Sequence, residues 1–365
     1  MEAPGADRYE VIGVMSGSSL DGLDLAWCEL VHDVGDWSFN IREARTVPYD
    51  TRFQQRLKDA MQGSALELAR LHRDLGDRIG LACHDLVKGR AVDLPVRQAG
   101  LIASHGHTLF HKPEEGLTLQ IGCGARVAAL TGTTTVCDFR SMDVALGGQG
   151  APLVPLGERL LFPRHKGFLN IGGICNVALH GDHHVTGYDV CIGNQALNFL
   201  ANEADLPYDK GGAMARTGRI IPELLDALNA LPFHHQQPPR SLGREWFDAW
   251  LKPLIAGQGD SLPDRLATVV EHIARQVATA LDFADGPVLV TGGGAHNTFL
   301  LERLRRLSTT RIEVPDVRTV DFKEALIFAL LGVLRMREEV NTLAGVTGAG
   351  RDSVGGAVYR APSAA

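Results

Sequence analysis

Basic side chains are in the minority in this chain. It has 36 lysines and arginines against 43 aspartates and glutamates, and a formal net charge of −7. No stretch gathers the basic residues into a stripe, which argues against a nucleic-acid partner. No apolar run reaches the roughly 18–20 residues that a membrane-spanning helix needs. Residues 1–8 lack the basic start of a signal peptide, so we expect a cytoplasmic protein with no membrane partner.

Paired cysteines are absent as well. The six cysteines are scattered along the chain, and no two of them form a C-x-x-C pair. Most lie in apolar, strand-like segments, which is typical of buried reduced thiols and not of a disulfide framework. His105, His107 and His111 have no obvious further ligand at metal-binding spacing, so we favour hydrogen bonding to a substrate over a metal. Two further pairs of adjacent histidines, at 183–184 and 234–235, lie in hydrophilic segments, and we expect their rings to be exposed to solvent.

Two common nucleotide-binding motifs are also missing. The chain has neither G-x-G-x-x-G nor G-x-x-x-x-G-K-[ST], which disfavours Rossmann-type and Walker-type sites. It has instead a glycine- and serine-rich turn at 13–24, between apolar segments at 9–14 and 23–30. This pattern predicts a β-hairpin with an unusually polar turn, whose N–H groups can form an anion-binding nest.

An acidic residue in that turn points to a cation. A carboxylate at Asp21 would repel a phosphate unless a cation lay between them, and Mg²⁺ is the simplest such ion. The plain alternative is an Asp-Gly hairpin turn with no further role, and this stretch alone leaves that alternative open.

The strand–turn–strand pattern recurs at 168–179, around Gly172 and Gly173. A third strand is expected after each hairpin, at 37–47 and at 184–188, the latter ending at Asp189. Two copies of one plan predict duplicated α/β domains that face each other across a cleft. The 365 residues also exceed what one compact core usually holds. We expect domains at 1–150 and 151–320, with the segment 321–365 returning towards the first.

Further glycine-rich and polar stretches follow predicted strands. A buried strand at 288–290 leads into Gly292, Gly293 and Gly294, and a helix follows at 298–307. Glycines there would let the backbone approach a nucleotide closely, beside the free N–H groups of a helix N-terminus. The polar cluster at 104–108 follows a short buried strand, which is where open α/β sheets place ligands. The segment 147–155 predicts a hinge, a ligand-contacting loop or a plain loop.

Together these motifs resemble the sugar-kinase, heat-shock chaperone and actin superfamily, and within it the anhydro-N-acetylmuramic acid kinase family. The resemblance covers nearly the whole chain. Each motif alone is weak, but their number and order make the resemblance specific. The matching segments are Gly13–Asp24, Ser104–Thr108, Asp138–Arg140, Gly148–Pro155, Leu169–Asn176, Gly187–Asp189, Gly292–Asn297 and Glu324–Ala325.

The resemblance implies a fold of two duplicated actin-like (ribonuclease H-like) domains with a central active-site cleft. It also implies an ATP- and Mg²⁺-dependent kinase that opens 1,6-anhydro-N-acetylmuramic acid with water and phosphorylates its 6-oxygen. Asp189 would activate the water, and Asp21 would hold Mg²⁺, through water, and act in catalysis. The implied ATP-binding residues are Ser16, Gly17, Ser18, Ser19, Leu20, Asp21, Gly22, Leu23, Gly172, Gly173, Asn176, Gly292, Gly293, Gly294 and Asn297. The implied substrate-binding residues are His105, His107, Arg140, Gln149 and Glu324.

The chain departs from the family pattern at several of these positions. Ser18 replaces a usual threonine and His107 a usual glutamine, and the run 191–194 differs from Cys-Gly-Pro-Gly-Asn. Ser141 and Met142 stand where many relatives have two more arginines, which changes how an acidic sugar would be held. A kinase of another anhydrosugar such as levoglucosan therefore stays open, as do a non-catalytic ATP-dependent sugar sensor and a homodimeric state.

Overall fold

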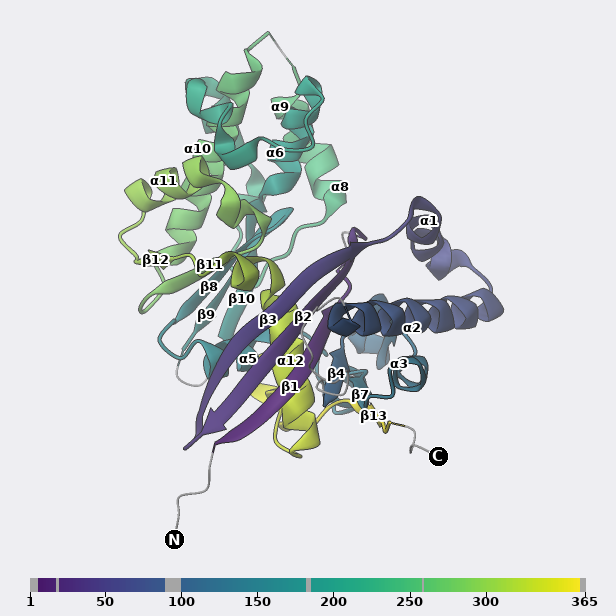
Figure 1. Cartoon of the computed structure of the whole chain (residues 1–365). Helices are drawn as coiled ribbons and strands as arrows, with labels where there is room; N and C mark the ends of the chain where they lie inside the picture. The colour runs from purple at the N-terminus through teal and green to yellow at the C-terminus, as the bar shows by residue number, and fades with distance from the viewer. Residues whose placement is uncertain (1–5, 18–19, 89–99, 182–184, 258, 362–365) are drawn as a thin grey trace. The chain divides into compact units, whose positions relative to one another are not determined.

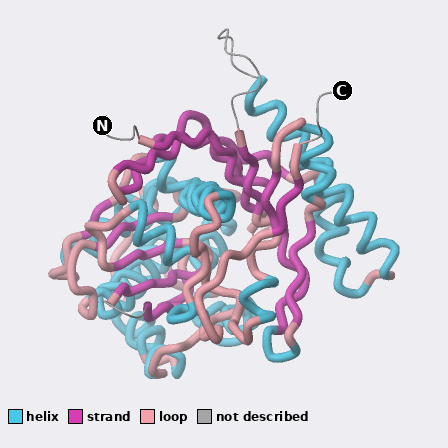
Figure 2. Tube along the Cα trace, turned by 90° about the horizontal axis from the view of Figure 1, so that it is seen from below, coloured by secondary structure: helices cyan, strands magenta, loops and turns pink. Residues whose placement is uncertain are grey.

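The computed structural model describes residues 6–17, 20–88, 100–181, 185–257 and 259–361, and the chain divides into two compact units. Unit 1 comprises Met1–Phe162 and Phe322–Ala365, and unit 2 comprises Pro163–Asp321. The first unit therefore continues past residue 150, and it includes the C-terminal segment. Figure 1 labels the helices and strands. Figure 2, coloured by secondary structure, shows that the chain contains many helices and many strands, as expected for an α/β protein.

Unit 1 is built on a six-stranded sheet in the order β13-β7-β4-β1-β2-β3. The first three strands in sequence form an antiparallel meander, and β4 and β7 continue the sheet in parallel beside β1. A separate antiparallel hairpin is made by β5 and β6. The strands are β1 (Asp7–Met15), β2 (Gly22–Asp33), β3 (Asp36–Pro48), β4 (Leu101–Ser104), β5 (His107–Lys112), β6 (Leu117–Ile121), β7 (Thr135–Cys137) and β13 (Ala357–Tyr359).

Two helices of unit 1 begin at side-chain caps. Asp50 caps α1 by accepting a hydrogen bond from the Phe53 N–H, and Ser64 accepts one from the Glu67 N–H at the start of α2. The apolar positions of α2, among them Leu71, Leu75 and Ile79, are buried against the meander, as their helical spacing predicts. The helices are α1 (Thr51–Asp59), α2 (Ala65–Lys88), α3 (Gly124–Thr131), α4 (Ser141–Ala145), α5 (Val154–Leu161), α12 (Val317–Met336) and α13 (Ala344–Thr347).

Helix α12 packs directly onto the sheet of unit 1. A side chain at Gly13 would overlap the Ala325 carbonyl, and one at Gly332 would meet the Ala103 side chain at 2.5 Å. Lys323, near the N-terminal end of the part of α12 that lies in unit 1, donates a hydrogen bond to Glu158 of α5 at 2.7 Å. Both side chains are buried, with exposed fractions of 8% and 3%.

Breaking this buried ion pair should destabilise unit 1. We expect Lys323→Met to lower the free energy of unfolding by about 3–5 kcal/mol, because it leaves the Glu158 charge buried without this partner. Adding Glu158→Leu should recover most of the loss, since it removes the buried charge with which Lys323 pairs. Urea unfolding of the three proteins measures both effects. A double variant no more stable than Lys323→Met would contradict the explanation.

Unit 2 repeats the same plan. Its five-stranded sheet has the order β10-β9-β8-β11-β12, with an antiparallel meander of β8, β9 and β10 and with β11 and β12 parallel beside it. The duplicated α/β fold expected from the sequence is therefore confirmed. The strands are β8 (Gly167–Ile171), β9 (Ile174–His180), β10 (Val185–Ile192), β11 (Val288–Thr291) and β12 (Ile312–Glu313). The helices are α6 (Asn194–Ala201), α7 (Pro222–Asn229), α8 (Arg244–Trp246), α9 (Lys252–Ile255), α10 (Leu262–Leu281) and α11 (Thr298–Leu307).

Two predicted boundaries are wrong. Strand β10 does not end at Asp189 but continues to Ile192, because a bulge at Val190 lets Cys191 and Ile192 pair with β9. The apolar run from Phe322 to Met336 predicts a helix that begins at Phe322, but helix α12 begins earlier, at Val317. Phe322 itself has non-helical backbone angles, φ −121° and ψ 18°, and the chain passes from unit 2 to unit 1 at this residue.

All six cysteines are free thiols, and four of them are buried, in agreement with the expectation from their sequence context. In the part of the chain that the structure describes, no helix combines the length and the apolar character needed to cross a membrane.

Candidate active site

A buried chain of hydrogen bonds holds the turn between β1 and β2 in place. Ser16, at the end of β1, is 3% exposed, and its Oγ lies 2.8 Å from the Tyr49 hydroxyl and 3.1 Å from His107 Nδ1. The Tyr49 N–H also donates to the Asp21 carbonyl at 3.1 Å. The Ser16 hydroxyl is therefore committed to the protein, and its contribution to the turn is to fix the backbone. Ser18 and Ser19 lie outside the described residues.

The rest of the turn is shaped by its packing. Leu20 has a positive φ of 60°, and a side chain at Gly22 would overlap the Val47 carbonyl at the edge of β3. Leu23 is buried in the core at 1% exposed. Asp21 is exposed between these anchored residues, so its carboxylate is available to water or to a hydrated ion. Among the described residues of the turn, Ser16, Gly22 and Leu23 are thus held by hydrogen bonds or packing, and Asp21 is an exposed acid.

His105 and Arg140 form a second buried polar group in unit 1. Arg140 Nε donates to His105 Nε2 at 3.0 Å, and His105 Nδ1 lies 3.0 Å from the Gly106 carbonyl. Because Nε2 accepts, the proton is on Nδ1 and the ring is neutral. Burial, with the Arg140 charge adding to it, lowers the pKa of His105 to about 3. Both ring nitrogens are thus engaged by the protein, which favours a role for His105 in positioning Arg140.

Arg140 is the cation of this group, and Glu324 lies near it. Burial lowers the pKa of Arg140 to about 10, and Glu324 opposes the shift. Desolvation by the surrounding protein, together with the nearby Asp24 and Glu158 carboxylates, raises the pKa of the Glu324 carboxyl. Phe328, one turn further along α12, packs on His105 at 4.7 Å between ring centroids. The structure therefore brings His105, Arg140 and Glu324 together within unit 1.

The glycine-rich segment 147–150 is held in place by a buried carboxylate. Asp143, 1% exposed, accepts hydrogen bonds from the Gly150 N–H at 2.7 Å and from the Thr347 hydroxyl at 2.7 Å. Arg140 also donates to the Gly150 carbonyl at 2.5 Å. Gln149 is exposed, and its N–H donates to the Thr347 carbonyl at 2.8 Å. These bonds hold the backbone at Gln149 in place while its side chain is exposed to solvent.

In unit 2, Asp189 ends a row of polar side chains that crosses the sheet. Thr291, Asn170, Asn176 and Asp189 are register partners on β11, β8, β9 and β10 in turn. Directly paired residues of neighbouring strands share a face of the sheet, so the four side chains lie on one face. Asn176, predicted to bind ATP, is thereby placed beside Asp189.

The Asp189 carboxyl is half-buried and held by one backbone donor. The Leu242 N–H donates to its Oδ2 at 2.8 Å, while Arg240 Nε donates to the Asp189 carbonyl at 3.1 Å. Burial raises the pKa of the Asp189 carboxyl, and the hydrogen bond from Leu242 partly offsets that rise. A fixed carboxylate with a raised pKa is suited to act as a general base.

The predicted nucleotide glycines of unit 2 fall into two groups. Side chains at Gly292 and Gly294 would overlap Asn170 Oδ1 and Ile171 Cγ2, so the fold itself requires these two glycines. At Gly172 a Cβ would meet nothing closer than 3.4 Å, at Gly173 nothing closer than 3.9 Å and at Gly293 nothing closer than 3.6 Å. None of these three has a positive φ. Neither packing nor backbone strain requires glycine at these three positions.

Asn194 lies close to two of these glycines, Gly172 and Gly293. The Asn194 N–H donates to the Gly172 carbonyl at 2.9 Å, and Asn194 Nδ2 donates to the Ile171 carbonyl at 3.2 Å. The Cβ position of Gly293 lies 3.6 Å from the same Nδ2. By contrast, the Asn297 side chain caps α11 by accepting from the Leu300 N–H at 3.0 Å and is 9% exposed, which makes it a structural residue.

A matched pair of substitutions separates the two kinds of glycine. We expect Gly294→Ala to destabilise the protein by about 1–3 kcal/mol, because the added methyl overlaps Ile171. Gly293→Ala should leave the unfolding midpoint within error of the parent and weaken nucleotide binding instead. Thermal unfolding and calorimetric titration with an ATP analogue measure the two effects. Equal nucleotide affinity in Gly293→Ala and the parent would contradict the assignment.

Sequence reasoning missed the residues that hold the site side chains in place. Tyr49, Asp143, Thr347 and Asn194 each bond to a predicted site residue or segment, and so does the backbone of Leu242. Apart from Asp143, which lies seven residues before Gly150, they are distant from their partners in sequence, and no local pattern marks them. Among the described residues no three His, Cys, Asp or Glu side chains gather to hold a metal ion.

Comparison with known protein sequences identifies the family of this chain. The sequence profile of the anhydro-N-acetylmuramic acid kinase family matches residues 9–361. An anhydro-N-acetylmuramic acid kinase of Gloeobacter violaceus is 36% identical over 369 residues, which covers 94% of this chain and 97% of that protein. One of Vibrio vulnificus is 36% identical over 372 residues, with 95% and 97% covered. One of Sulfurimonas denitrificans is 34% identical over 370 residues, with 95% and 98% covered. The chain belongs to the anhydro-N-acetylmuramic acid kinase family.

Proposed function

We propose that the protein opens 1,6-anhydro-N-acetylmuramic acid with water and phosphorylates the freed 6-oxygen from ATP. The products are N-acetylmuramic acid 6-phosphate and ADP. The observation that supports this most directly is the half-buried Asp189 carboxyl, fixed at the end of a polar row and with a raised pKa. A protein that only senses a sugar needs no such base.

The proposed role of Asp189 is to accept a proton from the attacking water. Leu242 occupies Oδ2, which leaves Oδ1 for that water. The water oxygen bonds to the anomeric carbon as the bond from that carbon to the 6-oxygen breaks. The 6-oxygen takes the γ-phosphoryl group, and ADP leaves. Phosphoryl transfer asks mainly for positioning and charge neutralisation, so the ring opening is where this chain must supply a base.

The residues present fit ATP and Mg²⁺. The open glycines 172, 173 and 293 let a nucleotide approach the backbone of unit 2, and the exposed Asp21 suits a hydrated Mg²⁺. When bound, Mg²⁺ would neutralise charge on the phosphate groups. On the sugar side we assign contacts to Arg140, Gln149, His107 and Glu324, with His105 positioning Arg140. Arg140 would face the acidic part of the sugar as a cation.

The proposal is tested by ADP release from purified protein with a panel of anhydrosugars. We expect release with 1,6-anhydro-N-acetylmuramic acid to exceed that with levoglucosan by a wide margin, since levoglucosan lacks the acidic group that Arg140 would pair with. Faster ADP release with levoglucosan would show that levoglucosan, and not 1,6-anhydro-N-acetylmuramic acid, is the preferred substrate. No release with any anhydrosugar, alongside intact ATP binding, would favour a sensor.

A further inference from the structure

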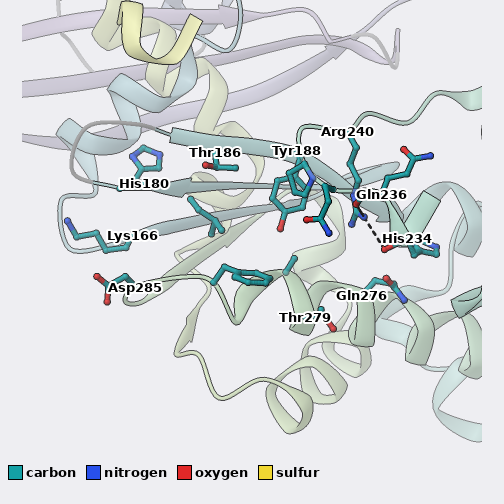
Figure 3. A pocket seen from close by; sticks show the side chains of 16 residues that line it. Lys166, His180, Thr186, Tyr188, His234, Gln236, Arg240, Gln276, Thr279 and Asp285 are labelled. Atoms are coloured by element: carbon teal, nitrogen blue, oxygen red, sulfur yellow. Dashed lines mark hydrogen bonds between the residues drawn. The ribbon is translucent and has the colours of Figure 1, made fainter. Parts of the chain in front are cut away.

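Unit 2 has a cavity of about 520 Å³ on the face of its sheet opposite to Asp189. Thr186 and Tyr188 of β10 line it, and because side chains alternate along a strand, Asp189 points to the other face. We call this cavity the β10 pocket. Its other walls come from β9, from the end of α10 and from the segment 234–240. Figure 3 shows Lys166 and Asp285 at one end and His234 and Gln276 at the other.

The volume and lining of the β10 pocket suit a small ligand. Small-molecule sites usually enclose about 300–1,000 Å³ and combine apolar surface with a few polar groups. Here the apolar surface includes the rings of Tyr188 and Phe283, and Phe283 is 73% exposed. Neutral polar groups come from Gln236 and Gln237, and the oxygens of Gln276 and Thr279 add acceptors, since Gln276 Nε2 and the Thr279 hydroxyl already donate to Asn229 and Arg275.

The charges around the β10 pocket argue for a neutral ligand. Arg240 Nε and Nη1 donate to the carbonyls of Asp189, Phe233, His234 and Gln236 at 2.8–3.1 Å, and Nη2 lies 3.5 Å from the Val190 carbonyl, so most of the donors of this guanidinium are already used. Lys166 and Asp285, of opposite charge, both line the same end of the pocket. Aromatic faces with uncharged amide and hydroxyl groups match a ring that has apolar faces and polar edges, which describes a saccharide.

His234 corrects an expectation from the sequence. Its ring is not solvated but lies 4.9 Å from the His272 ring, and burial lowers its pKa to about 4. It is therefore neutral at physiological pH and adds no charge at that end. His235 is exposed as expected, and residues 183–184 lie outside the described residues.

The wall of the β10 pocket is bonded to Asp189. Arg240 joins the segment 233–240 to β10, and the Asp189 N–H donates back to the Arg240 carbonyl at 3.0 Å. Two residues further on, the Leu242 N–H holds the Asp189 carboxyl. A ligand that touches Gln236 and Arg240 therefore touches the segment that orients this carboxyl.

We propose that the β10 pocket binds a small neutral saccharide with hydroxyl and amide groups, and that its occupancy alters turnover at Asp189. The link to turnover rests on the proposed function; the binding does not. Suitable probes are N,N′-diacetylchitobiose, which is neutral and bears two amides, and glucuronate as an acidic comparison.

The test combines calorimetric titration with steady-state turnover of the full chain. Thr279→Trp fills the pocket from the exposed end of α10, Phe283→Ala removes an aromatic face, and Thr309→Trp is the matched control at an exposed position outside the lining. We expect diacetylchitobiose to bind the parent and Thr309→Trp and to change their turnover. Both pocket variants should bind it about tenfold or more weakly and keep the parent's basal turnover.

Several results would overturn the proposal. They are no binding to the parent at millimolar probe, equal binding to Thr279→Trp and the parent, or tighter binding of glucuronate. Binding without a change in turnover would overturn the link to Asp189. A protein with no anhydrosugar kinase activity at all would refute the proposed function instead, and the titrations would still decide whether the pocket binds the probe.

Discussion

Replacing Asp189 by asparagine should lower turnover by roughly 10² or more, with little change in sugar affinity. Asparagine keeps the size of the side chain and can keep an oxygen towards the Leu242 N–H. It removes the basic oxygen that would take a proton from water. Steady-state rates of ADP formation and calorimetric titration with the sugar separate the two quantities.

The fold should tolerate this substitution. Because burial raises the pKa of the Asp189 carboxyl, its ionisation at neutral pH works against folding, so Asp189→Asn should leave the unfolding midpoint unchanged or raise it. Asp226→Asn, at an exposed position of α7 in the same unit, is the matched control and should keep full turnover. Near-normal turnover in Asp189→Asn would leave the family assignment in place and remove this residue from the chemistry.

The pH profile of the parent gives an independent check. A base works only when it is ionised, and burial raises the pKa of Asp189 above its ordinary value of 3.8. Turnover should therefore fall, as the pH is lowered, at a higher pH than an exposed aspartate would give. In Asp189→Asn, the remaining turnover should no longer show this fall at low pH.

Asp21→Ala should slow phosphoryl transfer by roughly 10² or more, because the exposed carboxylate that would hold the hydrated cation is lost. The backbone of the turn should persist, since Ser16, Tyr49 and Gly22 fix it without help from this side chain. Sugar binding should survive, and the remaining rate should need more Mg²⁺ than the parent does. Rates measured across a Mg²⁺ series test this.

The control for Asp21, which immediately precedes β2, is Asp33 at the far end of that strand. Asp33→Ala removes an exposed carboxylate from the end of β2 and should leave the Mg²⁺ dependence unchanged. The same Mg²⁺ dependence in Asp21→Ala and the parent would exclude Asp21 from the mechanism.

Periodicity and glycine spacing were enough to predict the fold. The two meanders, the long helix α2 and the strand before Gly292 lie where alternation, helical spacing and capping residues placed them. The end of β10 was predicted wrongly because Asp189 looks like a strand terminus, whereas a bulge carries the pairing past it. Helix α12 was predicted to start late because its polar first turn, 317–321, does not share the apolar character of the rest.

The candidate site was predictable as a set of motifs but not as a set of contacts. The sequence marks Gly292, Gly293 and Gly294 alike, and only the space around each shows that Gly293 is free of packing constraints. Likewise, His105 looked like a substrate ligand, yet Arg140 and the Gly106 carbonyl engage both its nitrogens. The bond from Arg140 joins residues that are 35 positions apart in the chain, and local sequence patterns do not record such a contact.

The measurement that tests the central claim most directly is the reaction of 1,6-anhydro-N-acetylmuramic acid and ATP in ¹⁸O-labelled water. If water attacks the anomeric carbon and the sugar's own 6-oxygen receives the phosphoryl group, the label will appear on the anomeric oxygen of the 6-phosphate product. The transferred phosphate will be unlabelled. Label in the phosphate instead would mean that ATP is hydrolysed by water, and it would contradict the proposal that this protein is an anhydrosugar kinase.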